Sequence, residues 1–343
     1  MTPERRLRRP SATERISGPA ELLQAVPYLL GFHPTRSLVL VGLDVGLLVV
    51  TARLDLVDAQ ARDVVASTIH AMHRGGSTSI VGAVYDHEAV AGAAGAELPW
   101  SAVAASVGRE AEGLGCPVVD ILLVIGDRWW SYFCAEPECC PAEGTPLPDG
   151  PSAFTAAATY AGVVALPNRA ALEAVLDPLP DDDRVRLGSH IARAENATAD
   201  AALAGPAQQH HRSIKRALFA AARSADEPGW ASSSDADAAR FGAALSVVAM
   251  RDALWMAVDD GRLDGRALWR DLGRRLPRPY DASPLFLFGW AAWRAGDGAL
   301  AGIAAERAIA SDPGYSAADL LLAALARGVD PRRLPKLRLP RSA

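Results

Sequence analysis

Three of the chain's four cysteines lie within one stretch of seven residues: Cys134, Cys139 and Cys140. Thiolates this close together can bind zinc, although a structural zinc ion usually takes four ligands in paired spacing and this stretch supplies three. A fourth ligand would then come from Cys116, His33 or His87. The alternative is a structural role, because a free cysteine packs as a compact hydrophobe. Glu136 and Glu138 argue against a redox role, since their negative charge opposes thiolate formation.

A second chemical candidate is the segment 31–37, GFHPTRS, which brings an imidazole, a guanidinium and two hydroxyls together. His33 could act as a general acid or base, Arg36 could hold a carboxylate or phosphate, and Ser37 lies beside them. Loops of this kind commonly carry function. The same residues could instead form a turn in which Pro34 fixes the backbone and the polar side chains bond the local main chain.

Charged residues alternate near the end of the second strand predicted within 37–56. Arg53 and Asp55 point to the same face of that strand. A helix covering the face would bury them as an ion pair, whereas a surface salt bridge is the commoner arrangement. Asp86 and Asp127 follow two further predicted strands, where open α/β sheets place ligands, but aspartate is also an ordinary turn residue.

Motifs of common nucleotide-binding and hydrolytic enzymes do not occur in the sequence. The glycines at 75–76 and 92–95 lack the strand-to-helix spacing that cradles phosphate. Neither Gly-x-Ser-x-Gly nor His-Glu-x-x-His occurs. His210 and His211 are adjacent on a predicted helix and diverge around it, which argues against a shared metal ion. The sequence therefore neither indicates nor excludes an enzyme.

The elements that position these residues are predicted from hydrophobic periodicity and from glycine and proline breaks. Helical periodicity in the first half appears at 19–30, 58–74 and 99–114. Strand-like runs appear at 37–56, 79–86 and 117–134, and glycines would fold the first and last of these into hairpins. Because a helix between two strands favours a parallel crossover, we expect an α/β domain with a mixed sheet of about five strands flanked by helices.

The second half is predicted to be all-α, with one long helix at 235–260 and a short strand at 162–166 as the last candidate strand. The stretch 285–313 aligns with a tetratricopeptide unit. Its small-residue positions are occupied by Gly289, Gly296, Ala301 and Ala308. A helix from 316 would begin the next unit. The sequence thus predicts tetratricopeptide-like helix pairs from about residue 240.

Length and composition indicate two folded domains. The chain has 343 residues, a length greater than one hydrophobic core usually organises. Half of the residues are hydrophobic and 22% are charged, a composition typical of folded globular proteins. We expect four parts: a disordered basic tail at 1–15, an α/β domain at 16–166, a helical domain at 167–330 and a basic, proline-rich tail at 331–343.

Charge and apolar runs restrict the partners and the compartment. A net charge of −5 provides no global positive field for nucleic acid. No run reaches the roughly 18 apolar residues of a membrane span, and no secretory signal follows the first arginines. A few cysteines without an export signal fit a reducing cytosol. We therefore expect a cytoplasmic protein that binds neither nucleic acid nor membrane.

Three strings in order resemble the actinobacterial family called domain of unknown function 4192 (DUF4192): SGPAELLQAVPYLLGFHPTRSLVLVGL, TARLDL and CAEPECCPAEGTPLP. The resemblance covers most of the chain, from about residue 16 to the tetratricopeptide-like end. It implies no particular activity.

Two functional expectations follow. The first is a protein-interaction or regulatory module whose helical region presents a concave groove to a protein or peptide, with the α/β domain as a ligand-sensing or docking module. It predicts an exposed strip on the inner helices. The second is an enzyme or metal-binding domain with one site formed by the His33 turn and the loop at 134–140. It predicts that these two segments converge at one end of the sheet.

Overall fold

The computed structural model describes residues 16–91, 97–134, 136–205 and 207–337. Within these ranges, residues 16–91, 97–134, 136–171 and 324–330 belong to one compact unit, the α/β unit. Residues 172–205, 207–323 and 331–337 belong to a second, the helical unit. The basic tail predicted at 1–15 lies outside the described residues.

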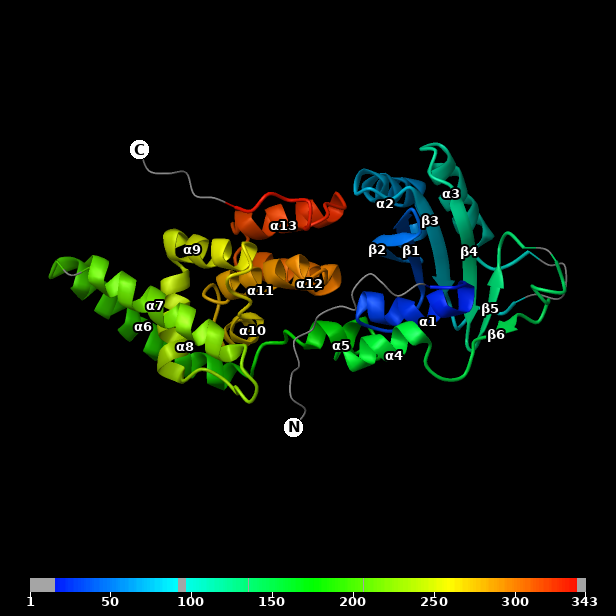
Figure 1. The fold of residues 1–343 in the computed structure, drawn as a ribbon. Helices are drawn as coiled ribbons and strands as arrows, with labels where there is room; N and C mark the ends of the chain where they lie inside the picture. Colours follow the sequence, from blue (N-terminus) through cyan, green and yellow to red (C-terminus); the bar gives the residue numbers. More distant parts are fainter. Residues whose placement is uncertain (1–15, 92–96, 135, 206, 338–343) are drawn as a thin grey trace. The chain divides into compact units, whose positions relative to one another are not determined.

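The α/β unit is built on a six-stranded mixed sheet in the order β2-β1-β3-β4-β5-β6 (Figure 1). The strands are β1 Ser37–Asp44, β2 Leu47–Asp55, β3 Ser79–Tyr85, β4 Val118–Ile125, β5 Arg128–Ser131 and β6 Thr145–Pro146. Among neighbouring strands, only β3 and β4 are parallel, and the other pairs are antiparallel. The parallel pair is the one whose strands are connected by a crossover that contains α3. The predicted mixed sheet is confirmed. The sixth strand was not predicted, because two residues are too few to show a period.

Helices cover both faces of this sheet. Residues alternate between the faces along a strand, so Leu38, Leu40 and Val84 pack in one core with α2 (Arg62–Arg74) and α3 (Ser101–Glu112). Tyr85, the next residue along, faces the other way, and its hydroxyl donates to the Leu23 carbonyl of α1 (Pro19–Leu30) at 3.5 Å. The helix α4 (Ala153–Tyr160) packs beside α1.

The helical unit is organised around α11. Its helices are α6 Asp181–Leu203, α7 Ala207–Ala225, α8 Asp235–Leu245, α9 Val248–Asp259, α10 Arg266–Arg275, α11 Ala282–Arg294 and α12 Gly298–Ser311. Two more helices, α5 (Arg169–Ala174) and α13 (Ser316–Ala326), lie where the chain passes between the units. Every residue of α11 except Arg294 is buried. Trp255 of α9 packs edge-on against Phe286 and Trp290 of α11, with ring centroids 4.9 and 5.0 Å apart. This aromatic cluster joins α9 to α11.

The prediction of one continuous helix at 235–260 is wrong. The segment forms two helices, α8 and α9, which meet at a bend of 100°. Val247 has an extended backbone (φ −82°, ψ 115°), which ends the regular helix. The Leu245 carbonyl at the broken end accepts a hydrogen bond from Ser283 Oγ of α11 at 2.9 Å. A tertiary contact therefore satisfies a group that a continuous helix would have bonded internally.

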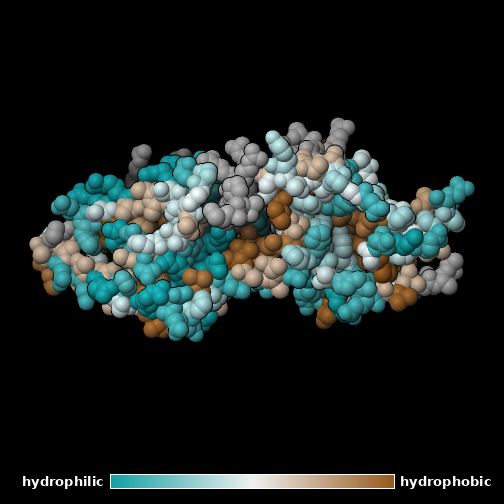
Figure 2. Space-filling view, turned by 90° about the horizontal axis from the view of Figure 1, so that it is seen from below, coloured by the Kyte–Doolittle hydropathy of each residue, from teal (hydrophilic) through white to brown (hydrophobic). Residues whose placement is uncertain are grey.

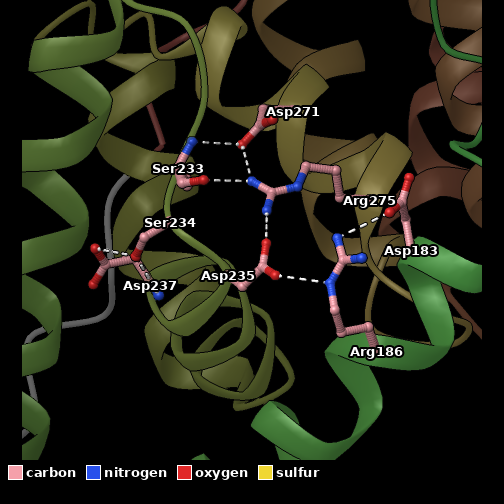
Figure 3. Close-up of polar contacts among 8 residues, drawn as sticks. All are labelled: Asp183, Arg186, Ser233, Ser234, Asp235, Asp237, Asp271 and Arg275. Atoms are coloured by element: carbon pink, nitrogen blue, oxygen red, sulfur yellow. Dashed lines mark hydrogen bonds and ion pairs between the residues drawn. The ribbon is translucent and has the colours of Figure 1, made fainter.

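A polar network joins α6, α8 and α10 (Figure 3). Arg275 donates to Asp235 at 2.5 Å and to the Ser233 carbonyl at 2.6 Å, and it pairs with Asp271. Arg186 of α6 donates to the same Asp235 at 3.1 Å. Two arginines thus converge on one carboxylate at the start of α8, where negative charge also interacts favourably with the helix dipole.

No single helix in the described part of the chain is both long and apolar enough to cross a membrane, and α8 and α9 reach that length only across their bend. Hydrophilic residues cover most of the face seen in Figure 2, and hydrophobic residues gather there in separate groups.

Candidate functional site

A cavity of about 520 Å³ lies in the α/β unit at the carboxyl ends of the parallel strands β3 and β4. Open α/β sheets bind ligands at this position because the loops that leave the strands diverge there. Apolar walls come from Leu23, Pro27, Pro34, Val124 and Leu147. Polar groups come from Gln24, Tyr28, His33, Asp86, His87 and Thr155. We call this cavity the sheet-end pocket.

His33 enters the pocket on a turn that is held from both sides. Gly31 ends α1 in the left-handed conformation (φ 83°), which glycine adopts without strain. Leu166 then clamps the turn, because its amide donates to the Gly31 carbonyl at 2.8 Å and its carbonyl accepts from the His33 amide at 2.9 Å. Phe32 and Pro34 are buried on either side, whereas the His33 side chain is exposed. The segment predicted as a short strand at 162–166 thus contributes only this single bridge.

Asp86 fixes the loop that carries His87. This carboxylate is buried directly after β3 and accepts hydrogen bonds from Trp100 Nε1 at 2.8 Å and from the Glu88 amide at 3.2 Å. Both of its oxygens therefore have protein donors. His87, the next residue, is exposed and lines the pocket. We infer that Asp86 positions this loop, while the two imidazoles are among the polar groups that line the cavity.

The remaining wall is the segment 147–151, which α1 holds in place. Gln24 Nε2 donates to the carbonyls of Pro148 and Gly150, each at 3.0 Å. Tyr28, one helical turn further along α1, lies 3.3 Å from Thr159 Oγ1 of α4 through its hydroxyl. Gln24 and Tyr28 were not singled out by sequence reasoning. Their signal was available, because they are polar residues four positions apart, on one face of a mostly apolar helix.

The other predicted catalytic candidates lie at the same end of the sheet, but outside the residues that line the pocket. Arg36 pairs with Glu88 and has a positive φ of 45°, which is uncommon for a residue other than glycine. Ser37 is buried, and its hydroxyl donates to the Thr35 carbonyl and accepts from Arg53 Nε, each at 2.8 Å.

The Arg53–Asp55 pair combines the two predicted arrangements. The Nη2 to Oδ1 distance is 2.5 Å, and the Arg53 side chain is 12% exposed while that of Asp55 is 57% exposed. The Arg53 guanidinium thus donates to two partners, the buried hydroxyl of Ser37 and the exposed carboxylate of Asp55. Of the five candidates, only His33 faces the pocket.

The cysteine cluster lies toward the other end of the strands. Ser131, at the end of β5, pairs with Leu122, and the Tyr132 amide donates to the Ile121 carbonyl. The chain that leads to Cys134 therefore runs toward the start of β4, whereas His33 lies at its finish. The prediction of one site shared by the His33 turn and the loop at 134–140 is wrong, because the antiparallel direction of β5 carries the cysteines away.

None of the three proposed distant ligands joins the cysteines in the described part of the chain. Cys116 is buried in the core, and its Sγ lies 3.8 Å from the Ser77 carbonyl. His33 and His87 face the sheet-end pocket instead. Cys134, Cys139 and Cys140 nevertheless lie together in the folded structure, since their sulfurs are all within 4.8 Å of one another.

The polar side chains that line the pocket differ in their hydrogen bonding. Among the described side chains, no hydrogen bond joins His33 or His87 to a hydroxyl or a thiol. The Thr155 hydroxyl is occupied, because it donates to the Ser152 carbonyl at 3.1 Å. The two imidazoles can donate or accept hydrogen bonds to a molecule placed between the apolar walls.

Comparison with known families supports the relationship suggested by the three sequence strings. A family model described as "Domain of unknown function (DUF4192)" matches residues 19–332. No curated protein and no solved structure shows significant similarity to the chain. The matched region includes the whole sheet, the sheet-end pocket, the cysteine cluster and nearly all of the helical unit. Because the match spans nearly the entire chain, this protein belongs to the DUF4192 family.

Proposed function

We propose that this protein is a cytoplasmic regulatory protein whose α/β unit binds a small molecule in the sheet-end pocket. The observation that carries the proposal is the pocket itself, a cavity of about 520 Å³ at the carboxyl ends of the parallel strands. Its size lies within the usual range of small-molecule sites. Its mixture of apolar walls with a few polar groups is also typical of such sites.

The lining favours a ligand with an apolar body and one anionic group, such as a carboxylate or a phosphate. His33 and His87 supply ring N–H donors that have no protein partner among the described hydrogen bonds. The Asp86 carboxylate already accepts from Trp100 Nε1 and from the Glu88 amide, so a ligand cation would have to share its oxygens with these two donors. The ring N–H groups of His33 and His87 can donate to an anionic group, while the apolar walls contact the rest of the molecule, so the pocket favours anionic, partly apolar ligands.

A thermal-shift screen tests this proposal. Small organic acids, phosphate esters, organic cations and neutral analogues are each added to the full-length protein. A ligand at one hundred times its dissociation constant stabilises the folded state by about 2.7 kcal/mol, which raises the melting temperature measurably. We expect stabilisers to come from the anionic, partly apolar classes.

The matched variants are His33→Ala and His87→Ala in the pocket and His70→Ala on the exposed face of α2. Loss of a hydrogen bond to a charged ligand group should weaken binding about tenfold in each pocket variant. The His70 variant should bind as the unmodified protein does. Stabilisers that act equally on all three variants, or stabilisers confined to cations, would contradict the proposal.

A second proposal concerns the helical unit, which we propose is tetratricopeptide-like and contacts a protein or peptide partner. Gly289 of α11 supports the repeat alignment, because a Cβ at this position would lie 3.1 Å from the Ala301 carbonyl oxygen and 3.1 Å from Ala304 Cβ. Such close crossing of small residues is what the aligned repeat requires. The burial of α11, however, leaves its face covered by neighbouring helices, so the groove expected along the inner helices is not formed there.

The surface that we assign to this partner is the outer bend between α8 and α9. Val247 and Val248 are 43% and 59% exposed at this bend. A photo-crosslinking residue at Val248, with the more exposed Val185 of α6 (75%) as the control, tests the proposal in cells of the source organism. A defined adduct from Val248 alone is expected, whereas equal labelling from both positions would contradict it.

A further inference from the structure

The loop after β5 gathers three thiols around a single point. Cys134 Sγ and Cys139 Sγ are 3.0 Å apart, and Cys139 Sγ and Cys140 Sγ are 3.9 Å apart. All three sulfurs lie within 4.8 Å of one another. The turn that brings them together is closed by the Glu136 carbonyl, which accepts from the amides of Cys139 and Cys140 at 3.2 and 2.8 Å. The convergence therefore follows from backbone geometry as well as from side-chain rotamers.

The loop is anchored where it leaves β5. Ser131 Oγ accepts from the amides of Phe133 and Cys134, each at 3.0 Å, and donates to Asp120 Oδ1 at 2.7 Å. Burial raises the pKa of the Asp120 carboxyl, and its hydrogen bond from Ser131 partly opposes that shift. Cys134 is thus fixed to the central strand β4 through two successive hydrogen bonds.

The loop is anchored again where it returns to the sheet. Trp130 Nε1 donates to the Ala142 carbonyl at 3.0 Å, and Arg128 donates to the Gly144 carbonyl at 2.8 Å. Gly144 has a positive φ of 80°, and a Cβ there would lie 2.5 Å from the Trp130 ring, so no other residue fits without displacing the loop. Residues of β5 therefore hold the loop in place on both sides of the three cysteines.

We propose that Cys134, Cys139 and Cys140 together bind one zinc ion, with a water molecule at the fourth position. Zinc–thiolate bonds of about 2.3 Å in a tetrahedron place neighbouring sulfurs about 3.8 Å apart. The Cys134–Cys139 and Cys139–Cys140 sulfur separations, 3.0 and 3.9 Å, bracket that value, and small rotations about the Cα–Cβ bonds equalise them. Three protein ligands leave one coordination position open, as in zinc sites that exchange or activate a bound molecule.

The surroundings favour a cation over the two alternatives from the sequence. Packing does not explain the cluster, since Cys139 is exposed and the other two are only half-buried. A disulfide between Cys134 and Cys139 would use two sulfurs and leave the adjacent third without a role. The exposed carboxylates Glu136 and Glu138 in the same turn add negative charge, which favours a bound cation. This site does not share residues with the sheet-end pocket, so the two proposals stand or fall separately.

Cobalt(II) substitution tests the site on the full-length, reduced protein. Cobalt(II) takes the zinc position, and its thiolate bonds give a charge-transfer absorption whose intensity scales with the number of coordinated sulfurs. We expect saturation at about one cobalt per chain, tetrahedral ligand-field bands, and displacement of cobalt by added zinc. The pocket variant His33→Ala should give the same titration.

The variants Cys134→Ser, Cys139→Ser and Cys140→Ser should each lower the charge-transfer intensity and weaken cobalt binding at least tenfold. The matched control is Cys116→Ala, which removes the one cysteine outside the cluster and should leave the titration unchanged. Circular dichroism of each variant establishes that it is folded, including Cys116→Ala, which removes a thiol from the core of the α/β unit. The proposal is overturned if the reduced protein shows no charge-transfer band, if the band persists when all three cysteines are replaced, or if only Cys134 and Cys139 contribute to it.

Discussion

The conformation of the pocket loop depends on a single buried carboxylate, Asp86. Its two oxygens accept from an indole and from a backbone amide. Burial of a polar group is tolerated when such partners exist, and removal of the acceptor leaves both donors unsatisfied. The neighbouring Tyr132 hydroxyl lies in the same region, and its pKa is raised by burial first and by the Asp86 charge second. Asp86 is therefore electrostatically connected to the core as well as to the pocket.

Replacing Asp86 by alanine should lower the free energy of unfolding by about 1–3 kcal/mol, because two donors lose their acceptor. Binding in the sheet-end pocket should weaken at the same time, since the loop that carries His87 loses its anchor. Urea denaturation measures the first effect. The matched control is Asp127→Ala, at the exposed end of β4, which should change stability by less than about 0.5 kcal/mol. Equal effects from both substitutions would show that Asp86 has no special role.

At this scale the sequence identified candidate residues that are neighbours along the chain, but not which segments lie together in space. The His33 turn and the cysteine stretch were both recognised as candidates, since their residues are adjacent in sequence. Their separation could not be predicted, because it depends on the direction of β5 relative to β4. Gln24 and Tyr28 reach the pocket only through the packing of α1 against α4 and the segment 147–151. Such contacts link residues more than a hundred positions apart.

Among the elements, the start of α8 is stabilised by charge. The pKa of Asp235 is lowered, first by its hydrogen bond from Arg186 and then by the charges of the two arginines, against the opposing effect of burial. A carboxyl group whose pKa is lower in the folded than in the unfolded state stabilises the fold when it is ionised. That contribution is present above the unfolded pKa, near 4, and is lost as the pH falls through the folded value.

The variant Asp235→Asn should therefore be less stable than the unmodified protein at neutral pH, and the difference should shrink as the pH falls below about 4. Thermal unfolding at a series of pH values measures this difference. Asp237→Asn, whose carboxylate pairs with the nearby Arg240 on the same helix, is the control for a loss of charge alone. A stability difference that stays constant down to acid pH would contradict the assigned role of Asp235.

The crossing of α11 and α12 requires glycine at position 289. A larger residue there would press on Ala301, Ala304 and Leu321, each within 3.2 Å of the added Cβ. We expect Gly289→Val to lower the free energy of unfolding by about 1–3 kcal/mol through overpacking. Gly188→Val in α6, where an added Cβ meets nothing within 4 Å, should change it by less than about 0.5 kcal/mol. Denaturant unfolding compares the two, and similar losses would argue against a close helix crossing.

Element types were largely predictable, but two features were not: the break between α8 and α9 and the short strand β6. The hairpin of β1 and β2, the helices α2 and α3, and the pair α11 and α12 follow from periodicity and glycine breaks. The break between α8 and α9 lies in a sequence with continuous helical periodicity, and it is stabilised by Ser283 from a distant helix. The strand β6 consists of two residues that pair with β5. In both cases the deciding contact comes from elsewhere in the chain.

For the molecule as a whole, the chain does not divide into two consecutive halves. Residues 324–330, which follow nearly all of the helical unit, belong to the α/β unit. Gly328 lies against α2, where an added Cβ would be 2.5 Å from the Ala71 carbonyl oxygen. Its positive φ of 64° adds a second reason for glycine. The α/β unit therefore includes a segment from near the end of the sequence, which composition alone did not indicate.

The variant Gly328→Val should destabilise the α/β unit and speed amide hydrogen exchange in α2. Gly229→Val is the matched control, because Gly229 also has a positive φ (89°) but an added Cβ meets nothing within 4 Å. Backbone strain is common to both substitutions, so the excess loss at Gly328, about 1 kcal/mol or more, reports the packing against α2. Exchange rates in α2 that respond equally to both variants would show that this segment does not support the helix.

The central claim is that the sheet-end pocket binds a small anionic, partly apolar molecule. The most direct measurement is a crystal structure of the full-length protein with the strongest stabiliser from the thermal-shift screen. The claim predicts the ligand between the apolar walls at the ends of β3 and β4, with its anionic group within hydrogen-bonding distance of His33 or His87. A ligand bound elsewhere, or one whose charged group points away from both imidazoles into solvent, would contradict it.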